Sequence, residues 1–230
     1  MKFLVKDSNK IDLHIHTNCS DGKYSVPQIL EEARDLGLEY ISFTDHDTDE
    51  VYYRYNKKKL EKEYGVKIIN GCELTVKYKG VEIHLLAYKC NPLFSKLVIP
   101  KLDFIIYSQG GMNLKKATKL IHIFGGQAVL AHPFKYNCNG KKLIESMLQD
   151  KCIDGIECVH PYHTQEEIDY LLNVCEKNNL LVTAGSDYHY KGRKCRNETI
   201  QAFLGDLPGS NSTVEKQLIR AKQMYKKAKR

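Results

Sequence analysis

One layout recurs along this 230-residue chain: an amphipathic segment, a Gly or Asn stop, and then a short β-branched run. Strand-like runs follow the predicted helices, which cover residues 25–36, 48–64, 113–124 and 164–179. Capping boxes begin the first of these four helices at Ser25 and the fourth at Thr164. Strands that alternate with helices in this way build βα units with parallel pairing. The layout therefore predicts an α/β fold.

The predicted strands number about seven. One pair is a hairpin over 74–88 that turns at Lys79-Gly80. The remaining strands are expected at residues 11–16, 39–43, 66–70, 127–131, 153–158 and 180–184. A barrel of seven or eight strands and an open doubly wound sheet both fit this pattern. Periodicity alone leaves the two architectures open.

The chain is predicted to form a single domain over residues 1–230, because its 42% hydrophobic content suits one core and no second core is evident. Residues 89–112 are the least periodic part and are interpreted as a loop over a site or a shortened insertion. Residues 212–230 are expected to form a C-terminal helix with a basic tail. The oligomeric state is left open.

Composition narrows the class of protein. No run approaches the 18 or so apolar residues that a membrane span requires, and the first ten residues do not form an export signal. The eight cysteines include no CxxC pair, which is typical of reduced thiols. These features predict a cytoplasmic protein that does not bind membranes.

Imidazole and carboxylate side chains stand at or near the ends of most predicted strands. Any one of them could be an ordinary hydrogen-bonded residue. In a parallel α/β fold, however, the carboxyl ends of the strands converge, so residues up to 175 positions apart would meet at one site. The set comprises six histidines and three carboxylates: His14, His16, Asp21, His46, Glu73, His84, His132, Asp187 and His189.

Such a set is suited to metal ions. The spacing of His14 and His16 places both imidazoles on one side of a strand. Mixed imidazole and carboxylate ligands accept Mn, Fe or Zn, and nine ligands exceed the needs of one ion. Two or three divalent ions are therefore expected, and closely spaced ions are suited to phosphoryl chemistry.

Six segments between residues 11 and 190 resemble, in order, the motifs of the PHP (polymerase and histidinol phosphatase) family: IDLHIHTNCSDG, FTDHD, GCELT, EIHLLAY, VLAHP and AGSDYH. The resemblance implies a distorted (βα)7 TIM-like barrel, with a trinuclear metal site at the carboxyl ends of the strands. It also implies a hydrolase that acts on phosphate esters.

The resemblance divides the ligands among three metals. The first would be held by His14, His16, Glu73 and Asp187, and the second by Glu73, His84 and His132. The third would be held by Asp21, His46 and His189. Within this set, catalytic roles are expected for His16, Asp187 and His189.

Two further segments, GGQAVLAHPFKY and GIECVHPYHTQEE, are similar to one branch of the family. That branch removes the 3′-phosphate of nucleoside 3′,5′-bisphosphates and trims short RNA from its 5′ end. Lys135, His163 and Arg193 would then contact phosphate. The chain departs from the branch in its short segment 89–116 and in Tyr190, where a small residue is usual.

The expected reaction is in-line hydrolysis of a phosphomonoester or terminal phosphodiester by a metal-bridging hydroxide. The substrate would be a phosphorylated small molecule or a short nucleic acid. A histidinol-phosphate-type phosphatase, an amide hydrolase of related architecture and a catalytically silent PHP scaffold are the alternatives. The third ligand group argues against amide hydrolysis, and the complete ligand set argues against a silent scaffold.

Some neighbouring residues have two interpretations. Asp45 and Asp47 are expected to orient a ligand or cap a helix. Glu157 could support a ligand or be satisfied by the backbone. The tyrosines at 52, 53 and 55 could stack on bases or pack against the barrel.

Overall fold

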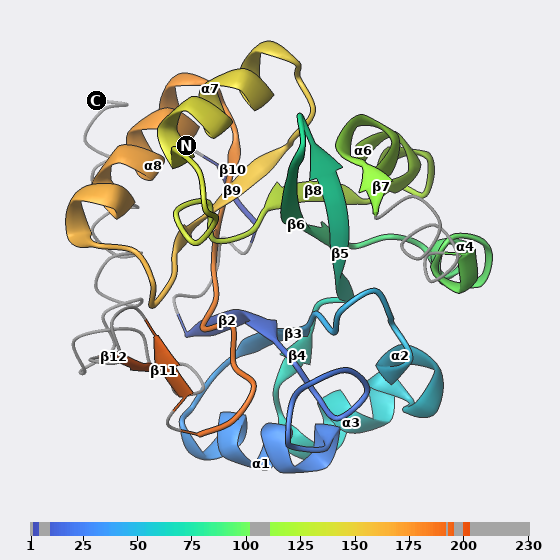
Figure 1. The fold of residues 1–230 in the computed structure, drawn as a ribbon. Coiled ribbons are helices and arrows are strands. Elements are labelled where there is room, and N and C mark those ends of the chain that lie inside the picture. Colours follow the sequence, from blue (N-terminus) through green and yellow to red (C-terminus); the bar gives the residue numbers. More distant parts are fainter. Residues whose placement is uncertain (1, 5–9, 102–110, 192, 196–199, 203–230) are drawn as a thin grey trace, which may run out of the picture.

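The computed structural model describes residues 2–4, 10–101, 111–191, 193–195 and 200–202. Figure 1 shows a mixed α/β molecule in which helices cover two sheets. The helices are α1 (Val26–Asp35), α2 (Val51–Arg54), α3 (Lys57–Tyr64), α4 (Pro92–Leu97), α6 (Leu114–Ile123), α7 (Gly140–Gln149) and α8 (Gln165–Lys177), with a short 3₁₀ turn at Ile99–Lys101. None of these described helices is long and apolar enough to cross a membrane.

The larger sheet has seven strands in the order β1-β10-β9-β8-β6-β5-β7. In that order, their bounds are Lys2–Phe3, Leu181–Ala184, Gly155–Val159, Gln127–Leu130, Val81–Tyr88, Gly71–Tyr78 and Met112–Asn113. A second sheet contains β2 (Ile11–Ile15), β3 (Tyr40–Phe43) and β4 (Lys67–Ile68), and a separate antiparallel pair contains β11 (Arg193–Cys195) and β12 (Ile200–Ala202). Pairing in the two main sheets is parallel except where β6 lies between β5 and β8.

Backbone hydrogen bonds join the two main sheets at two seams. At one seam, the His16 N–H donates to the Tyr188 carbonyl at 2.8 Å. At the other, the Asp47 N–H donates to the Glu73 carbonyl at 2.8 Å, and the Glu73 N–H donates to the Asp45 carbonyl at 3.2 Å. The α/β prediction is confirmed, whereas closure into a complete barrel stays a prediction. Both seams lie at strand ends that carry candidate ligands.

Most predicted elements are present, but the prediction of one continuous helix over 48–64 was wrong. The segment is two helices, because Tyr55 adopts an extended backbone (φ −123°, ψ 139°) and Asn56 starts α3 by accepting a hydrogen bond from the Lys59 N–H. The predicted hairpin is β5–β6, which turns at Lys79 and Gly80 with φ values of 47° and 84°.

Some elements were not predicted. Helix α7 was missed, although Asn139 caps it by accepting from the Lys142 N–H at 3.1 Å. The described part of segment 89–112 contains α4 and the 3₁₀ turn at Ile99–Lys101. The helix expected over 212–230 lies outside the described residues.

The apolar interior consists of two clusters. The larger one lies along the seven-stranded sheet and includes Leu85, Leu130 and Ile156, each fully buried. The smaller one fills the space between the three-stranded sheet and helices α1 and α3, and includes Ile41 and Leu30. Since the sheets are hydrogen-bonded to each other, neither cluster is shown to be a separate domain, and the single-domain assignment stays a prediction.

Candidate metal centre

Glu73 of β5 is the centre of the predicted ligand set. It is fully buried, and both of its oxygens face histidines. Oε2 lies 3.1 Å from Nε2 of His14, 3.1 Å from Nε2 of His16 and 3.3 Å from Nδ1 of His46. Oε1 lies 2.9 Å from Nδ1 of His84 and 3.1 Å from Nε2 of His132. One carboxylate thus meets five imidazoles from four different segments of the chain.

Asp187 extends this cluster from the end of β10. Its Oδ1 lies 3.6 Å from Nε2 of His14 and 3.3 Å from Nε2 of His16. The same oxygen lies 3.5 Å from Nδ1 of His189. Asp187 therefore lies near the two histidines of the β2 segment and near His189, which follows it in the loop after β10.

Asp21 closes the exposed side of the cluster. Its Oδ2 lies 3.1 Å from Nε2 of His189 and 3.9 Å from Nε2 of His46, and its Oδ1 lies 3.5 Å from Nδ1 of His16. The Asp21 side chain is 55% exposed, whereas Glu73 is inaccessible. The candidate centre therefore runs from the interior to the surface.

Three overlapping groups of side chains bring one ligand atom each to within 4.8 Å of the others. They are His14/His16/Glu73/Asp187, His16/Asp21/His46/His189 and His46/Glu73/His84. The first reproduces the expected first metal site, and the second contains the expected third site with His16 added. The remaining group was expected to contain Glu73, His84 and His132, but it contains His46 instead of His132. His132 still lies 3.1 Å from Oε1 of Glu73.

Several buried atoms of the cluster have no hydrogen-bond partner, so they are available to bind metal ions. These atoms are Nε2 of His14, both ring nitrogens of His16, Oε2 of Glu73 and Nδ1 of His132. An unsatisfied buried polar group costs about 1–3 kcal/mol. Divalent cations would satisfy most of these lone pairs, and imidazoles with carboxylates are ligands that they accept. The residues present therefore fit divalent metal ions.

The pKa values of the cluster also indicate that its buried carboxylates are stabilised by nearby positive charge. Burial opposes ionisation of Glu73, yet His14 and the other surrounding histidines hold its pKa well below the usual value. Burial also opposes protonation of His16, but Asp187 and Glu73 outweigh it and raise the pKa of His16 to about 9. By contrast, burial lowers the pKa of His132 to about 3. Without cations, protons on some histidines compensate the buried carboxylates.

The backbone turns sharply where it presents several of these side chains. Asp187 and His132 have φ values of 54° and 23°, and Asp47 has a φ of 50°. Such left-handed conformations cost non-glycine residues about 1–3 kcal/mol, and they concentrate at functional sites. At Asp187 and His132 they redirect the chain as it leaves β10 and β8.

Asp45 and Asp47 hold the backbone around His46, as one of their two predicted interpretations stated. Asp45 accepts from the Thr17 N–H at 2.7 Å and from the Thr17 hydroxyl at 2.8 Å, which fixes the loop leading to Asp21. Asp47 accepts from the Thr75 N–H at 2.8 Å and from its hydroxyl at 2.6 Å. These bonds tie His46 to β2 on one side and to β5 on the other.

The structure places two of the three predicted phosphate-contacting residues beside the cluster. Lys135 Nζ lies 2.7 Å from Asp187 Oδ2 and its side chain is 32% exposed. His163 is buried, its Nδ1 lies 3.0 Å from the Cys158 carbonyl oxygen, and its Nε2 has no hydrogen-bond partner. His160 is next to His163, with ring centroids 5.4 Å apart, and its Nε2 lies 3.8 Å from Asp187 Oδ2. The side chain of Arg193 lies outside the part that the structure describes.

Two residues that support the cluster were missed from the sequence. Asp12 accepts from the Ser186 N–H at 3.0 Å, which fixes the chain just before Asp187. Tyr136 uses its hydroxyl to accept from the His84 N–H at 2.9 Å and to donate to the Ala131 carbonyl at 3.0 Å. Asp12 could have been predicted, because it lies in the same strand as the HxH motif, two residues before His14. The sequence gives no signal for Tyr136.

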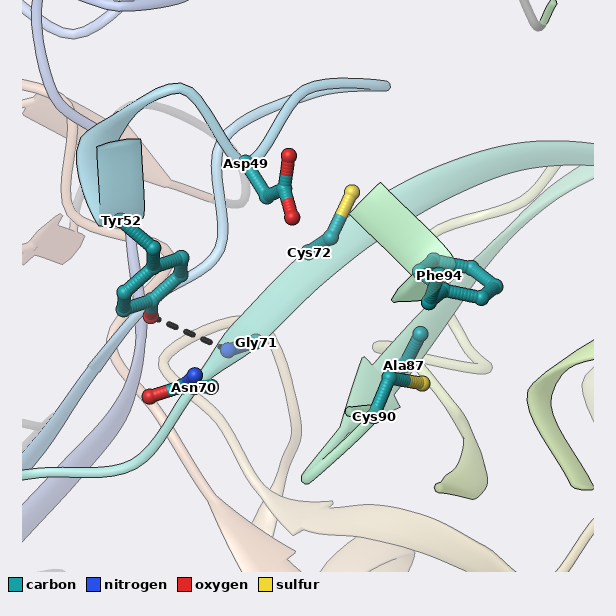
Figure 2. Close-up of a pocket in the computed structure, with 8 residues that line it drawn as sticks. All are labelled: Asp49, Tyr52, Asn70, Gly71, Cys72, Ala87, Cys90 and Phe94. Carbon is teal, nitrogen blue, oxygen red and sulfur yellow. Dashed lines mark hydrogen bonds between the residues drawn. The ribbon is translucent and has the colours of Figure 1, made fainter. Parts of the chain in front are cut away.

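A small pocket lies on the other face of β5 from the cluster, since successive strand residues point to opposite faces. Figure 2 shows Cys72 of β5 in this pocket with Asp49, Tyr52 and Cys90. Tyr52 accepts from the Gly71 N–H at 3.0 Å and donates to the Phe43 carbonyl at 2.7 Å, which supports packing over base stacking for this tyrosine.

Burial in this pocket raises the pKa of Asp49 to about 6, above its ordinary value of 3.8. The folded protein therefore holds a proton more tightly than the unfolded chain, so Asp49 should reduce stability as the pH rises from about 4 to about 6. We expect Asp49→Asn to be more stable than wild type at pH 7 by about 2–3 kcal/mol, and no more stable at pH 4. Urea unfolding at both pH values measures this, with the exposed Glu63→Gln as control. Equal differences at both pH values would contradict it.

The chain is similar to known proteins in both sequence and fold. The family model described as the PHP domain matches residues 12–205. An uncharacterised protein of Methanocaldococcus jannaschii is 31% identical over 165 residues, which cover 67% of this chain and 83% of that protein. A 5′-3′ exoribonuclease of Haemophilus influenzae is 22% identical, with 80% of this chain and 91% of that protein covered.

The fold is also similar to a solved structure. The crystal structure of a protein of Bifidobacterium adolescentis, assigned as a metal-dependent phosphoesterase, superposes with a TM-score of 0.69 at 21% identity. The match covers 91% of this chain and 96% of that one. The family model extends over most of the chain and includes all nine residues of the candidate centre. The chain therefore belongs to the PHP family of metal-dependent phosphoesterases.

Proposed function

We propose that this protein hydrolyses phosphomonoesters or terminal phosphodiesters of nucleotides, namely nucleoside 3′,5′-bisphosphates or short 5′-phosphorylated RNA. The observation that carries the proposal is the convergence of three overlapping ligand groups on Glu73 and its neighbours. Closely spaced sites of this kind are suited to displacement at phosphorus. The similarity to an exoribonuclease supports a nucleotide substrate.

The proposal includes two or three divalent ions, Mn, Fe or Zn, held by the nine residues of the candidate centre. Bound there, such ions would lower the pKa of water and neutralise charge on phosphate oxygens. Glu73 would be shared between ions, since its two oxygens face different histidines. His16 would also be shared, since its Nδ1 faces Asp21 while its Nε2 faces Glu73.

The chain's own residues would bind and orient the substrate. Lys135 is partly exposed beside Asp187, so its ammonium group can meet phosphate oxygens that approach the cluster. His163 keeps Nε2 without a protein partner. Because its Nδ1 donates to the Cys158 carbonyl, His163 is proposed to contact the same phosphate through Nε2 as an imidazolium, the form in which both ring nitrogens are donors. His16, Asp187 and His189 are proposed to surround the reacting phosphorus. His16 belongs to two of the ligand groups, and Asp187 Oδ1 lies 3.3 Å from Nε2 of His16 and 3.5 Å from Nδ1 of His189.

The test measures phosphate release by protein reconstituted with Mn²⁺. Adenosine 3′,5′-bisphosphate, a short 5′-phosphorylated RNA and histidinol phosphate are compared as substrates. His14→Ala is expected to reduce hydrolysis of the first two by at least about 10³-fold, because it removes a buried ligand. His122→Ala is the matched control, since His122 is half-exposed and pairs with Asp154 away from the cluster.

Preference for the two nucleotide substrates, lost in His14→Ala and kept in His122→Ala, would support the proposal. Cleavage of histidinol phosphate alone would replace the nucleotide by a small metabolite. No cleavage by a protein that binds Mn²⁺ would favour the silent scaffold.

A further inference from the structure

Glu157 of β9 lies behind the candidate ligands and uses both carboxylate oxygens. It is fully buried. Oε1 lies 3.0 Å from Nδ1 of His14, and Oε2 accepts from the main-chain N–H of His132 at 2.9 Å. The two contacts belong to different segments, since His14 is on β2 and His132 follows β8. One side chain therefore supports two residues of the cluster.

The chemistry of these contacts determines which ring nitrogen of His14 carries the proton. A carboxylate only accepts hydrogen bonds, so Nδ1 of His14 must be the donor. In the neutral ring, Nε2 then keeps its lone pair. That atom lies 3.1 Å from Glu73 Oε2 and 3.6 Å from Asp187 Oδ1, and it has no hydrogen-bond partner. The lone pair is thus directed into the ligand group that contains both carboxylates.

His189 has the same arrangement with a different acceptor. Its Nδ1 lies 2.8 Å from the main-chain carbonyl oxygen of Asp187, while its Nε2 faces Asp21 at 3.1 Å. His132 is held through its backbone, whose φ of 23° is unfavourable without support. The bond from the His132 N–H to Glu157 supplies that support.

We propose that Glu157 is a positioning residue of the metal centre. It keeps His14 protonated at Nδ1, so that Nε2 can bind metal, and it anchors the backbone that presents His132. The inference rests on the proposed function in one respect, that this cluster binds metal. It does not depend on which phosphoester is cleaved.

Glu157→Gln changes the hydrogen-bonding groups of this side chain while keeping nearly the same side-chain size. An amide offers one accepting oxygen and one donating nitrogen, whereas the His132 N–H and the His14 Nδ1–H both need an acceptor. If the amide oxygen keeps the His132 contact, its nitrogen faces His14 and drives the proton to Nε2. If the amide turns over, its nitrogen opposes the His132 N–H. In either orientation one ligand is disturbed.

The test uses Zn²⁺ alone as probe, with affinity measured by chelator competition. We expect Glu157→Gln to bind Zn²⁺ about 10–100-fold more weakly than wild type, which is the usual loss when a residue behind a ligand is changed. Ring-¹⁵N NMR of the zinc-loaded wild type should show His14 protonated at Nδ1, with the resonance assigned through His14→Ala. Glu166→Gln, an exposed change in the first turn of α8, is the matched control and should keep wild-type affinity.

Zinc affinity of Glu157→Gln within about twofold of wild type would overturn the proposal, as would a wild-type His14 bound through Nδ1. A purely structural role would lower the melting temperature and leave affinity in the folded variant unchanged, which also counts against it. If the variant does not fold, the wild-type NMR spectrum decides alone. Zinc binding as expected without phosphoester hydrolysis would overturn only the proposed function, whereas hydrolysis with an unaffected Glu157→Gln would overturn only this inference.

Discussion

Glu73→Gln is expected to reduce phosphoester hydrolysis by about 10²- to 10⁴-fold. Glu73 is the most connected residue of the cluster, because its oxygens lie within 3.3 Å of ring nitrogens of five histidines. Glutamine removes the negative charge and replaces one accepting oxygen by a donor. Removing one partner from a buried charge pair costs about 3–5 kcal/mol, which corresponds to about two to nearly four orders of magnitude in an equilibrium or rate.

Metal content separates this effect from general unfolding. We expect the folded Glu73→Gln protein to retain fewer Mn²⁺ or Zn²⁺ ions per chain by elemental analysis after dialysis. Glu82→Gln is the matched control, because Glu82 lies on the same hairpin, is exposed and pairs across the strands with Lys77. A Glu73→Gln protein with the metal content and turnover of wild type would show that the cluster is not the active centre.

Much of the fold was predictable because its signals are local. The capping box of Thr164 with Glu167 and the left-handed Gly65 after α3 lie where the sequence indicates helix ends. The hairpin turn at Lys79 and Gly80 follows from the same local chemistry. The break between α2 and α3 was missed, because Tyr55 carries no helix-breaking signal and takes its extended backbone in the folded context.

Most candidate ligands were predictable because they stand at or near a strand end, and topology brings strand ends together; His84, in the middle of β6, is an exception. The residues that hold them were harder to predict, because their partners are distant in sequence. Asp12 contacts Ser186, and Tyr136 contacts the backbone of His84. Such pairs depend on the register between strands, which hydrophobic periodicity does not specify. The sequence therefore predicted the candidate ligands that the structure brings together, but left the function of Glu157 between two interpretations.

Gly185→Ala is expected to damage both the fold and the candidate centre, although it adds only one methyl group. A Cβ at Gly185 would lie 2.3 Å from Cβ of His14 and 2.8 Å from Oε1 of Glu157. Neither is the end of a flexible side chain that could move aside, because the His14 Cβ is fixed by β2 and the Glu157 oxygen is hydrogen-bonded. Relief requires β2 and the end of β10 to separate. We expect a loss of about 3 kcal/mol in the free energy of unfolding, together with weaker metal binding.

Gly125→Ala provides the matched control for this substitution. Gly125 has a φ of 74° and a Cβ there would meet nothing within 4 Å, so alanine adds only backbone strain of about 1–2 kcal/mol. Urea unfolding and Zn²⁺ affinity of both variants should separate the two costs, since Gly125→Ala loses stability alone and Gly185→Ala loses stability and affinity. Wild-type zinc affinity in a folded Gly185→Ala protein would mean that His14 tolerates displacement from Glu157. The close approach of β2 to β10 would then serve the fold without serving the metal centre.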